Sequence, residues 1–410
     1  MVRILFAWEL GANFGHLARD LPVAQRLREL GHDVLFAVKD VRIAMQVLAP
    51  SKFRFVQVPR PRAPLRSAGP PLNYSGILMG AGYCNATVLS GLVHGWLRIF
   101  DAYSPDIVVI NHAPTALLAA HVGRLSAIAT CIGFELPPDA DVLPSIRPWE
   151  NIPEHRLRQA DTLALQQINS VLHQHGAPPL PRVADLFAGV PAVLTTFAEL
   201  DHYGARAGAQ YVGPVSALSN AAERAWPQAG GPRVFAYLRP SVPGFELLLE
   251  ALQEAGASVL CVTPGVSRDV VARFASPSFD IVTQPVALGP VLQDADLAVV
   301  YGTGTMADAL LAGVPLLMVP QVVEQALVAR RIEALGAGIL WAPPRTPESA
   351  RNALARVLSN SALRHNAQQF ARRHREFTQE QATFDIANAV LGAAATAIDR
   401  RHRTDEATVL

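Results

Sequence analysis

The residues best placed to do chemistry in this chain lie in the loop Tyr301, Gly302, Thr303, Gly304 and Thr305. The loop follows an apolar run, Leu297–Val300, and precedes a predicted helix over Met306–Ala312. Where a strand passes through a glycine-containing turn into a helix, free backbone N–H groups and the helix dipole favour a bound phosphate. We therefore expect residues 301–305 to bind the diphosphate of a nucleotide without a metal ion.

The elements around this loop predict an α/β fold. Strand-like runs alternate with helical patterns, as in parallel sheets with crossover helices. The first half predicts four strands and two helices, and the pattern then restarts with further strands and a helix. The predicted strands are Arg3–Trp8, Asp33–Val38, 105–110, Ala127–Cys131, Arg233–Leu238, Ser258–Val262 and Asp280–Val282, and the predicted helices are Leu17–Leu30, Thr115–Leu125 and Phe245–Ala255. The restart predicts two Rossmann-like domains that face each other across a crevice.

The predicted boundaries follow composition. Residues 1–214 form the N-terminal domain, 215–232 a linker, 233–375 the C-terminal domain, and 376–410 a helix that packs back on the N-terminal domain and ends in a mobile tail. The linker is rich in Ala, Ser and Gly, which favours a break between domains. Residues 59–95 are rich in Pro, Gly and Asn, and we expect loops with short helices there.

Length and charge exclude several classes of protein. At 410 residues the chain exceeds one ordinary hydrophobic core. Lys and Arg number 35 against 34 Asp and Glu, so nothing favours a nucleic-acid partner. No run of about 18 uncharged apolar residues predicts membrane insertion. Three widely spaced cysteines argue against a disulfide framework and a zinc site, and a cytoplasmic location is expected.

Together these motifs resemble the nucleotide-sugar-dependent glycosyltransferases of the GT-B fold, especially the bacterial natural-product and macrolide branch. That family carries His-Gly-Gly-x-Gly-Thr, then Ala-Leu-x-x-Gly-Val-Pro, then Pro and Asp-Gln. This chain has Val-Tyr-Gly-Thr-Gly-Thr over 300–305, Ala-Leu-Leu-Ala-Gly-Val-Pro over 309–315, then Pro320 and Glu324-Gln325. Gly15-His16, after the first predicted strand, is a second match.

The resemblance implies that His16 is the general base that takes a proton from the acceptor hydroxyl. A neutral imidazole with an ordinary pKa near 6.5 suits that task. Asn111 stands where the family commonly has an aspartate that orients the histidine. An amide can accept a hydrogen bond from an imidazole N–H, but it cannot stabilise imidazolium by charge. In the alternative interpretation, His16 only caps the helix predicted from Leu17.

The resemblance further implies a UDP- or dTDP-linked sugar as donor, bound by the C-terminal domain without a cofactor or a metal. Val300 replaces a diphosphate-binding histidine of the family, and Arg239 could supply the missing positive charge across the crevice. Glu324 and Gln325 correspond to the pair that hydrogen-bonds the sugar hydroxyls. The alternatives are a solvent-facing loop arginine at 239 and a capping acid at 324.

The acceptor site is expected in the N-terminal loops, with a small apolar or aromatic acceptor. The candidate contacts are Asn13, Phe134, Glu135 and Trp149. The predicted function is thus an inverting, metal-independent glycosyltransferase whose partners are two small molecules, with a homodimer left open. Two alternatives remain open: a catalytically impaired nucleotide-sugar-binding helper of the same fold, and a different two-domain crevice enzyme such as an epimerase. The absence of Gly-x-Gly-x-x-Gly after the first strand argues against the epimerase.

Overall fold

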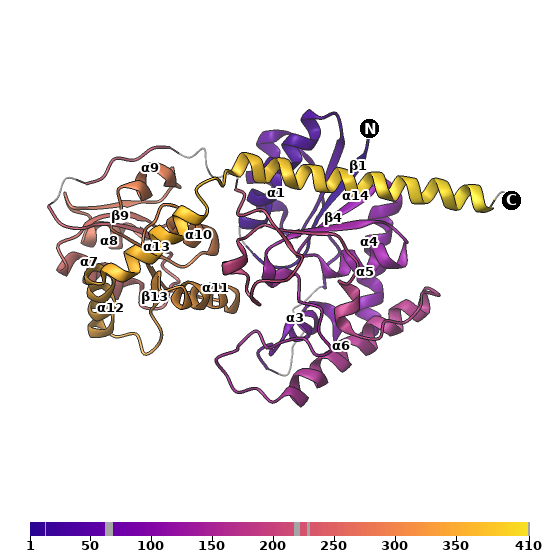
Figure 1. Ribbon diagram of the computed structural model, residues 1–410, viewed down its shortest axis with the longest axis horizontal. Helices are drawn as coiled ribbons and strands as arrows, with labels where there is room; N and C mark the ends of the chain where they lie inside the picture. Colours follow the sequence, from indigo (N-terminus) through magenta and orange to yellow (C-terminus); the bar gives the residue numbers. More distant parts are fainter. Residues whose placement is uncertain (13, 62–68, 217–221, 228–229, 409–410) are drawn as a thin grey trace. The chain divides into compact units, whose positions relative to one another are not determined.

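The chain forms two compact α/β units, which are described separately (Figure 1). Unit 1 comprises Met1–Ser216 and Thr378–Leu410, and unit 2 comprises Ala217–Phe377. The computed structural model describes residues 1–12, 14–61, 69–216, 222–227 and 230–408, with 401–408 described as backbone only. Each unit is built on a parallel sheet, which confirms the predicted fold class of two Rossmann-like domains.

Unit 1 contains a seven-stranded sheet in the order β3-β2-β1-β4-β5-β6-β7, with every neighbouring pair parallel. The predicted strands Arg3–Trp8, Asp33–Val38 and Ala127–Cys131 are confirmed. The strands are β1 (Arg3–Trp8), β2 (Asp33–Val38), β3 (Arg54–Gln57), β4 (Ile107–Asn111), β5 (Ala127–Cys131), β6 (Ala192–Leu194) and β7 (Gln210–Tyr211). The central strands β1 and β4 are buried and apolar because helices cover both of their faces.

Alternate residues of the central strands enter two hydrophobic layers. Leu5 and Ala7 pack in the cluster that also holds buried side chains of α4, α5 and α6, whereas Phe6 points to the other face. The helices of unit 1 are α1 (Gly15–Glu29), α2 (Val41–Val47), α3 (Tyr74–Leu78), the π-helical turn η2 (Met79–Tyr83), α4 (Ala86–Tyr103), α5 (Pro114–Val122), α6 (Glu154–Gln174) and the short 3-10 helices η1 (Ala49–Ser51), η3 (Gly133–Glu135), η4 (Val183–Leu186) and η5 (Ala198–Leu200).

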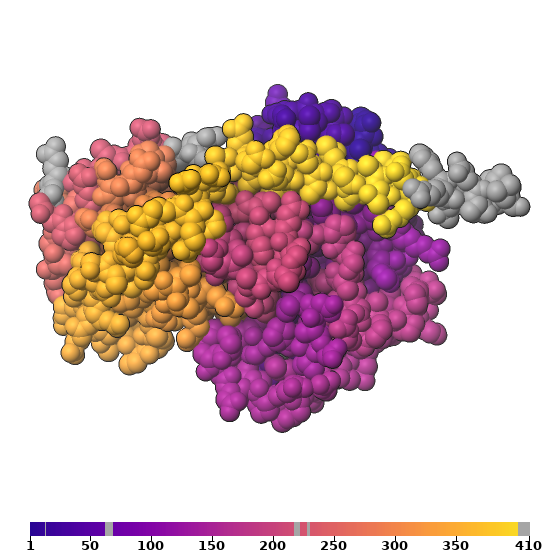
Figure 2. Space-filling view, viewed as in Figure 1, coloured from indigo at the N-terminus to yellow at the C-terminus, as the bar shows by residue number. Residues whose placement is uncertain are grey.

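The last helix, α14 (Gln379–Thr408), belongs to unit 1 although it follows unit 2 in the sequence. It packs against α1, β4 and β5. Ile386, Ala387 and Val390 form its buried side. Figure 2 shows its outer side at the surface of the unit. The helix continues to Thr408, so the backbone is helical over most of the segment in which a tail was predicted.

Unit 2 contains a six-stranded parallel sheet in the order β10-β9-β8-β11-β12-β13. The strands are β8 (Arg233–Tyr237), β9 (Ser258–Val262), β10 (Phe279–Val282), β11 (Leu297–Val300), β12 (Leu316–Met318) and β13 (Gly338–Leu340). The helices are α7 (Phe245–Glu254), α8 (Arg268–Phe274), α9 (Leu288–Gln293), α10 (Thr303–Leu311), α11 (Val323–Ala334), α12 (Pro347–Ser359) and α13 (Ser361–Arg373).

Both sheets reverse their strand order beside their first strand. In unit 1, β1 lies between β2 and β4, and in unit 2, β8 lies between β9 and β11. The loops that leave neighbouring strands at such a point run to opposite faces of the sheet, which opens space for a ligand at the carboxyl ends of the strands. The candidate residues follow these strands: β1 and β4 lead to His16 and Asn111, and β8 and β11 lead to Arg239 and the 301–305 loop.

Length and apolar composition decide whether a helix meets the criterion for crossing a membrane. Among the described residues, no single helix is long and apolar enough to cross a membrane. The pair Tyr74–Tyr83 and Ala86–Tyr103 meets the criterion only when the two halves are combined across a bend of 79°. The buried residues of α4 lie on one side, where they pack against α5 and α6.

Candidate functional site

The imidazole of His16 lies in the first turn of α1, directly after the carboxyl end of β1. Its ring stacks on Trp8, with 5.4 Å between ring centroids, and its side chain keeps 12% exposure. Gly11 permits this position, because a methyl group there would collide with Nε2 of His16. Gly11 also has a φ of 77°, which favours glycine. His16 is thus inside the helix and does not act as its cap.

Asn111 ends β4 and fixes the His16 ring. The Nδ1 atom of His16 lies 2.9 Å from Oδ1 of Asn111. The amide orientation follows from its other contacts, because Nδ2 donates to Oδ2 of Asp20 at 2.7 Å and to the backbone oxygen of His16 at 3.1 Å. Oδ1 is therefore the acceptor and Nδ1 carries the proton. In a neutral ring this leaves the lone pair on Nε2.

A buried ion pair lies beside this contact. Nη2 of Arg19 donates to Oε2 of Glu135 at 2.8 Å and also to Oδ1 of Asn111. Oε1 of Glu135 lies 3.3 Å from Nδ1 of His16. The backbone N–H of Ile132 donates to Oε2 of Glu135 at 2.9 Å. Glu135 sits in η3, at the end of β5, so three neighbouring strands, β1, β4 and β5, position one polar cluster.

The pKa values of the cluster follow from burial and charge. Burial alone would raise the pKa of Glu135, but the charge of Arg19 outweighs it, aided by the bond from the backbone N–H of Ile132, and that pKa is lowered to about 2. Burial raises the pKa of Asp20 to about 7, although Arg19 and the Asn111 amide oppose the shift. Glu135 is therefore ionised at neutral pH, whereas Asp20 titrates near pH 7.

The ring of His112 lies beside that of His16. Its ring centroid lies 6.0 Å from that of His16 and 6.1 Å from that of Tyr74. Burial lowers the pKa of His112 to about 3, so the ring is neutral. His112 adopts a φ of 47°, an uncommon conformation for a residue other than glycine. Its backbone oxygen accepts from the N–H of Leu10 at 2.9 Å, which ties the loop after β1 to the end of β4.

In unit 2 the loop after β11 enters α10 earlier than the sequence pattern indicated. The helix begins at Thr303 and not at Met306, so Thr303, Gly304 and Thr305 form its first turn. The first N–H groups of a helix have no partner within the helix. Gly304 is exposed, and a methyl group on Gly302 or Gly304 would meet no atom within 4 Å. The helix start therefore has room for an anion.

Arg239 follows β8, the neighbour of β11 in the sheet. Its guanidinium interacts with the hydroxyl of Tyr301, whose ring stacks on Tyr237 at 5.8 Å between centroids. Burial raises the pKa of Tyr301, and Arg239 opposes that shift. The arginine thus lies beside the first residue of the 301–305 loop within unit 2. Val300 is fully buried in β11 and offers no polar group to the loop.

Glu324 and Gln325 lie in the first turn of α11, after β12. Oε1 of Gln325 accepts from the backbone N–H of Gln321 at 2.9 Å, and the hydroxyl of Ser241 donates to Oε1 of Gln321 at 3.2 Å. These contacts link the loops after β8 and β12. Because β11 lies between those strands, Arg239, the 301–305 loop and the 324–325 pair share one edge of the sheet.

Comparisons with known proteins agree with this arrangement. Residues 246–382 match the family model of the erythromycin biosynthesis protein CIII-like C-terminal domain. A curated relative, the PGL/p-HBAD biosynthesis rhamnosyltransferase of Mycobacterium bovis (strain BCG / Pasteur 1173P2), is 26% identical over 90% of this chain and 83% of its own length. The calicheamicin glycosyltransferase CalG4 superposes with a TM-score of 0.71 at 17% identity, over 95% of this chain and 98% of its own. The glycosyltransferase VinC, solved with dTDP, superposes with a TM-score of 0.65 at 18% identity, over 96% of this chain and 100% of its own.

The chain is a glycosyltransferase with the GT-B fold. The resemblance stated from its motifs and the predicted enzyme class are thereby confirmed. At these identities the superpositions establish the fold alone, and the roles of individual residues in this glycosyltransferase are argued from its own geometry.

The four candidate acceptor contacts of the glycosyltransferase have different positions. Phe134 is buried, with its ring near those of His112 and His202. Trp149 is 38% exposed. Asn13 lies outside the described residues. Glu135 does not line an open wall, because its carboxylate is buried behind His16 and paired with Arg19.

One group of side chains has the composition of a metal site. Ligand atoms of His16, His112 and Glu135 lie within 4.8 Å of one another. The carboxylate of Glu135 is already paired with the guanidinium of Arg19, which offsets the negative charge that would attract a cation. These three residues therefore fit a metal ion poorly.

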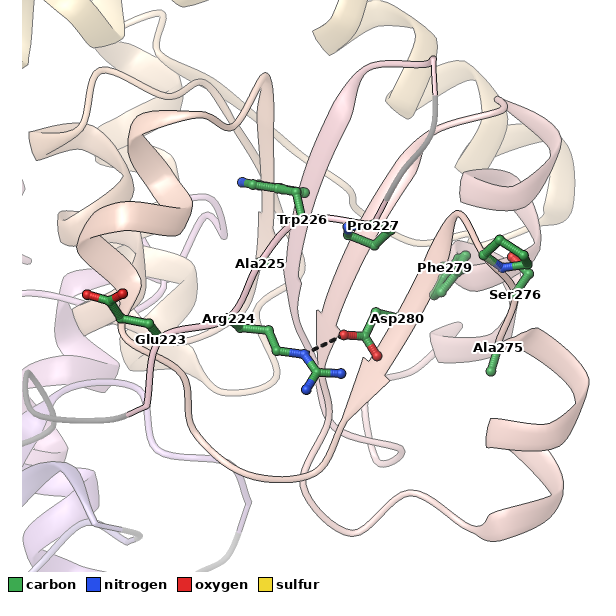
Figure 3. Close-up of a pocket in the computed structure, with 10 residues that line it drawn as sticks. Glu223, Arg224, Ala225, Trp226, Pro227, Ala275, Ser276, Phe279 and Asp280 are labelled. Atoms are coloured by element: carbon green, nitrogen blue, oxygen red, sulfur yellow. Dashed lines mark hydrogen bonds and ion pairs between the residues drawn. The ribbon is translucent and has the colours of Figure 1, made fainter.

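A hollow in unit 2 lies away from the candidate residues (Figure 3). Its volume is about 570 Å³, and Arg224 and Asp280 form an ion pair of 2.7 Å across part of it. The side chains that line it come from Glu223–Pro227, from the segment between α8 and β10, and from the start of β10. None of its lining residues is a predicted site residue.

The sequence analysis missed Arg19 and Asp20, two charged residues of the His16 cluster, and also Glu9, which accepts from backbone N–H groups at the start of α5. Arg19 and Asp20 are consecutive charged residues on a helix whose neighbours are apolar, and Glu9 follows a buried strand directly. All three are buried. A charged residue at a position that the hydrophobic pattern assigns to the core was the available signal, since such residues need a partner.

Proposed function

We propose that this glycosyltransferase is an inverting, metal-independent enzyme that moves a sugar from a nucleotide diphosphate to a hydroxyl of a small apolar or aromatic acceptor, with His16 as general base. The observation that carries the proposal is the contact between Nδ1 of His16 and Oδ1 of Asn111 at 2.9 Å. It fixes the tautomer that leaves Nε2 free of its proton, which a general base requires.

The proposed reaction is a single displacement. The acceptor O–H gives its proton to Nε2 of His16 while its oxygen attacks the anomeric carbon. The bond from that carbon to the diphosphate oxygen breaks, and the leaving diphosphate carries the electron pair. The N–H groups at the start of α10 and the guanidinium of Arg239 would bind the negative charge on the leaving group.

The proposed donor is a dTDP-linked deoxysugar. Two comparisons support this choice: the mycobacterial relative is named a rhamnosyltransferase, and VinC was solved with dTDP. Glu324 and Gln325 are the proposed contacts to the sugar hydroxyls. Since Oε1 of Gln325 is already used by Gln321, its amide NH₂ is the group left to face a hydroxyl. Trp149 and Phe134 remain the proposed apolar contacts to the acceptor.

The test begins with donor choice. Calorimetric titration with dTDP, UDP and GDP should give the tightest binding for dTDP, and GDP preference would contradict the donor assignment. Transfer from dTDP-rhamnose is then assayed against a panel of phenols and apolar alcohols in the presence of EDTA. The proposal expects activity that EDTA does not reduce, and a product whose anomeric configuration is opposite to that of the donor. Retained configuration, measured by NMR, would contradict the displacement mechanism.

A further inference from the structure

We propose that Glu135 is a positioning residue that supplies the negative charge facing His16, a charge that the neutral amide of Asn111 cannot supply. The inference rests on the proposed role of His16 as general base. Two functions are divided between two side chains: Asn111 orients the ring, and Glu135 stabilises the imidazolium that forms when the ring takes the acceptor proton.

The carboxylate of Glu135 is held rigidly enough for this role. Oε1 lies 3.3 Å from Nδ1 of His16, and Oε2 accepts from Arg19 and from the backbone N–H of Ile132. The hydroxyl of Tyr74 donates to the backbone oxygen of Glu135 at 3.2 Å. The side chain of Glu135 is 3% exposed, so little water screens its charge from the ring.

Both polar atoms of the Asn111 amide have two hydrogen-bond partners each. Its Oδ1 accepts from His16 and Arg19, and its Nδ2 donates to Asp20 and to the backbone of His16. These contacts restrict the rotation of the imidazole and select its tautomer, but they place no net charge near the ring. A proton arriving at Nε2 therefore needs a carboxylate elsewhere, and the carboxylate of Glu135 lies in direct reach.

Other charged groups also act on the ring and must be counted. Arg19 shares the charge of Glu135 and so reduces its effect on His16. Asp20 is linked to the ring through the Asn111 amide, and His112 is neutral beside it. Lys39 donates to the backbone oxygen of Gly11 at 2.5 Å, and Glu9 is buried near it at the end of β1. Among these groups, Glu135 alone places a carboxylate oxygen within ion-pair distance of Nδ1.

The proton balance of the step is simple. Before reaction, Nδ1 is protonated and the Arg19–Glu135 pair is neutral overall. After Nε2 accepts the acceptor proton, the ring carries one positive charge and Glu135 still carries its negative charge. No proton passes to Glu135, since its low pKa keeps it ionised. After release of the product, the ring returns its proton to solvent.

The test is Glu135→Gln, which removes the charge and keeps the shape. The imidazole pKa of His16, measured by NMR of the full chain with ¹⁵N-labelled histidine, should fall by about one to two pH units relative to wild type. His16→Ala identifies the resonance. Transfer from dTDP-rhamnose should fall about 10- to 100-fold in kcat, with the dTDP Kd unchanged. If Glu135 only balances Arg19, Glu135→Gln will lower the melting temperature and leave the imidazole pKa unchanged, and that result overturns the proposal.

A double variant distinguishes loss of the Glu135 charge from loss of folding. Asn111→Asp combined with Glu135→Gln places the carboxylate at position 111, where Oδ1 lies 2.9 Å from Nδ1 of His16. The same oxygen accepts from Arg19, so the guanidinium keeps a partner. Asp20 can hold a proton and donate it to the new carboxylate, because burial raises its pKa to about 7. The double variant should restore the imidazole pKa and most of kcat, and failure to restore either contradicts the proposal. If the wild-type protein transfers no sugar, the proposed function fails, while the NMR measurement still decides the role of Glu135.

Discussion

Nδ1 of His16 and Oδ1 of Asn111 lie 2.9 Å apart although the two residues are separated by 95 positions in the sequence. The contact exists because β1 and β4 are adjacent and in register, with Trp8 opposite Asn111 at their carboxyl ends. The chain between these strands forms β2, β3 and the helices up to α4, and the sheet order then brings β4 back beside β1. The topological switch of unit 1 therefore builds the candidate catalytic cluster.

The position of the His16 ring depends on Gly11. Gly11→Ala should lower kcat at least about 10-fold, because the added methyl group would displace Nε2 from its position. Gly208→Ala is the matched control: Gly208 has a similar positive φ of 72°, but its added methyl group would meet no atom within 4 Å. Both variants should lose about 1 kcal/mol of stability from backbone strain. Equal kcat values for the two variants, measured at saturating donor, would show that Gly11 does not position the ring.

Gly304 tests whether the start of α10 binds the diphosphate. Gly304→Ala should preserve or slightly raise the melting temperature, because alanine favours a helix over glycine by up to about 1 kcal/mol and the site is open. It should weaken dTDP binding about 10-fold if the phosphates approach this backbone closely. Gly289→Ala in α9 is the control, since it also adds a methyl group in open space. Calorimetric Kd values that match for both variants would place the diphosphate elsewhere.

Arg239 is the proposed replacement for the positive charge missing at Val300. Arg239→Ala should raise the Kd for dTDP about 10- to 100-fold, because a charge-assisted hydrogen bond to phosphate would be lost. Arg239→Lys should recover part of the affinity as a point charge without the planar donor geometry. The comparison is made by titration calorimetry at one salt concentration. An unchanged Kd in Arg239→Ala would assign the arginine a purely local role beside Tyr301.

The sequence predicted the framework of this protein better than the details of its site. Short buried runs such as Arg3–Trp8 and Ser258–Val262 predicted strands at their observed bounds, since each is an apolar run of strand length. The helix over Ala86–Tyr103 was not predicted, because the Pro-, Gly- and Asn-rich composition of residues 59–95 suggested loops with short helices. Tertiary packing of its Leu, Val and Trp residues against α5 and α6 decides the helix.

The candidate site was predicted in part, for a physical reason. His16 and Asn111 follow strands that a Rossmann order brings together, so their proximity follows from topology. The position of Glu135 does not, because it depends on the 3-10 turn η3 and on the capture of its carboxylate by Arg19. Such contacts join residues 116 positions apart and leave no local pattern in the sequence.

Glu9 gives a prediction for stability against pH. Burial raises its pKa from 4.5 to about 7, against the bonds it accepts from Thr115 and Ala116. The folded state therefore holds this proton more tightly than the unfolded state, and the contribution of Glu9 to stability falls as pH rises from about 4.5 to 7. Glu9→Gln removes that dependence. Relative to wild type, the variant should gain about 1–3 kcal/mol between pH 4.5 and pH 8 in urea unfolding. A difference that stays constant with pH would contradict the raised pKa.

The most direct test of the account is the rate of sugar transfer by His16→Gln. Glutamine keeps a polar side chain of similar length but cannot accept a proton at neutral pH. With dTDP-rhamnose and an acceptor found active with wild type, kcat should fall about 100- to 10,000-fold, while the Kd for dTDP stays within twofold because the proposed nucleotide contacts lie in unit 2. A variant that transfers sugar at the wild-type rate would contradict the assignment of His16 as the general base.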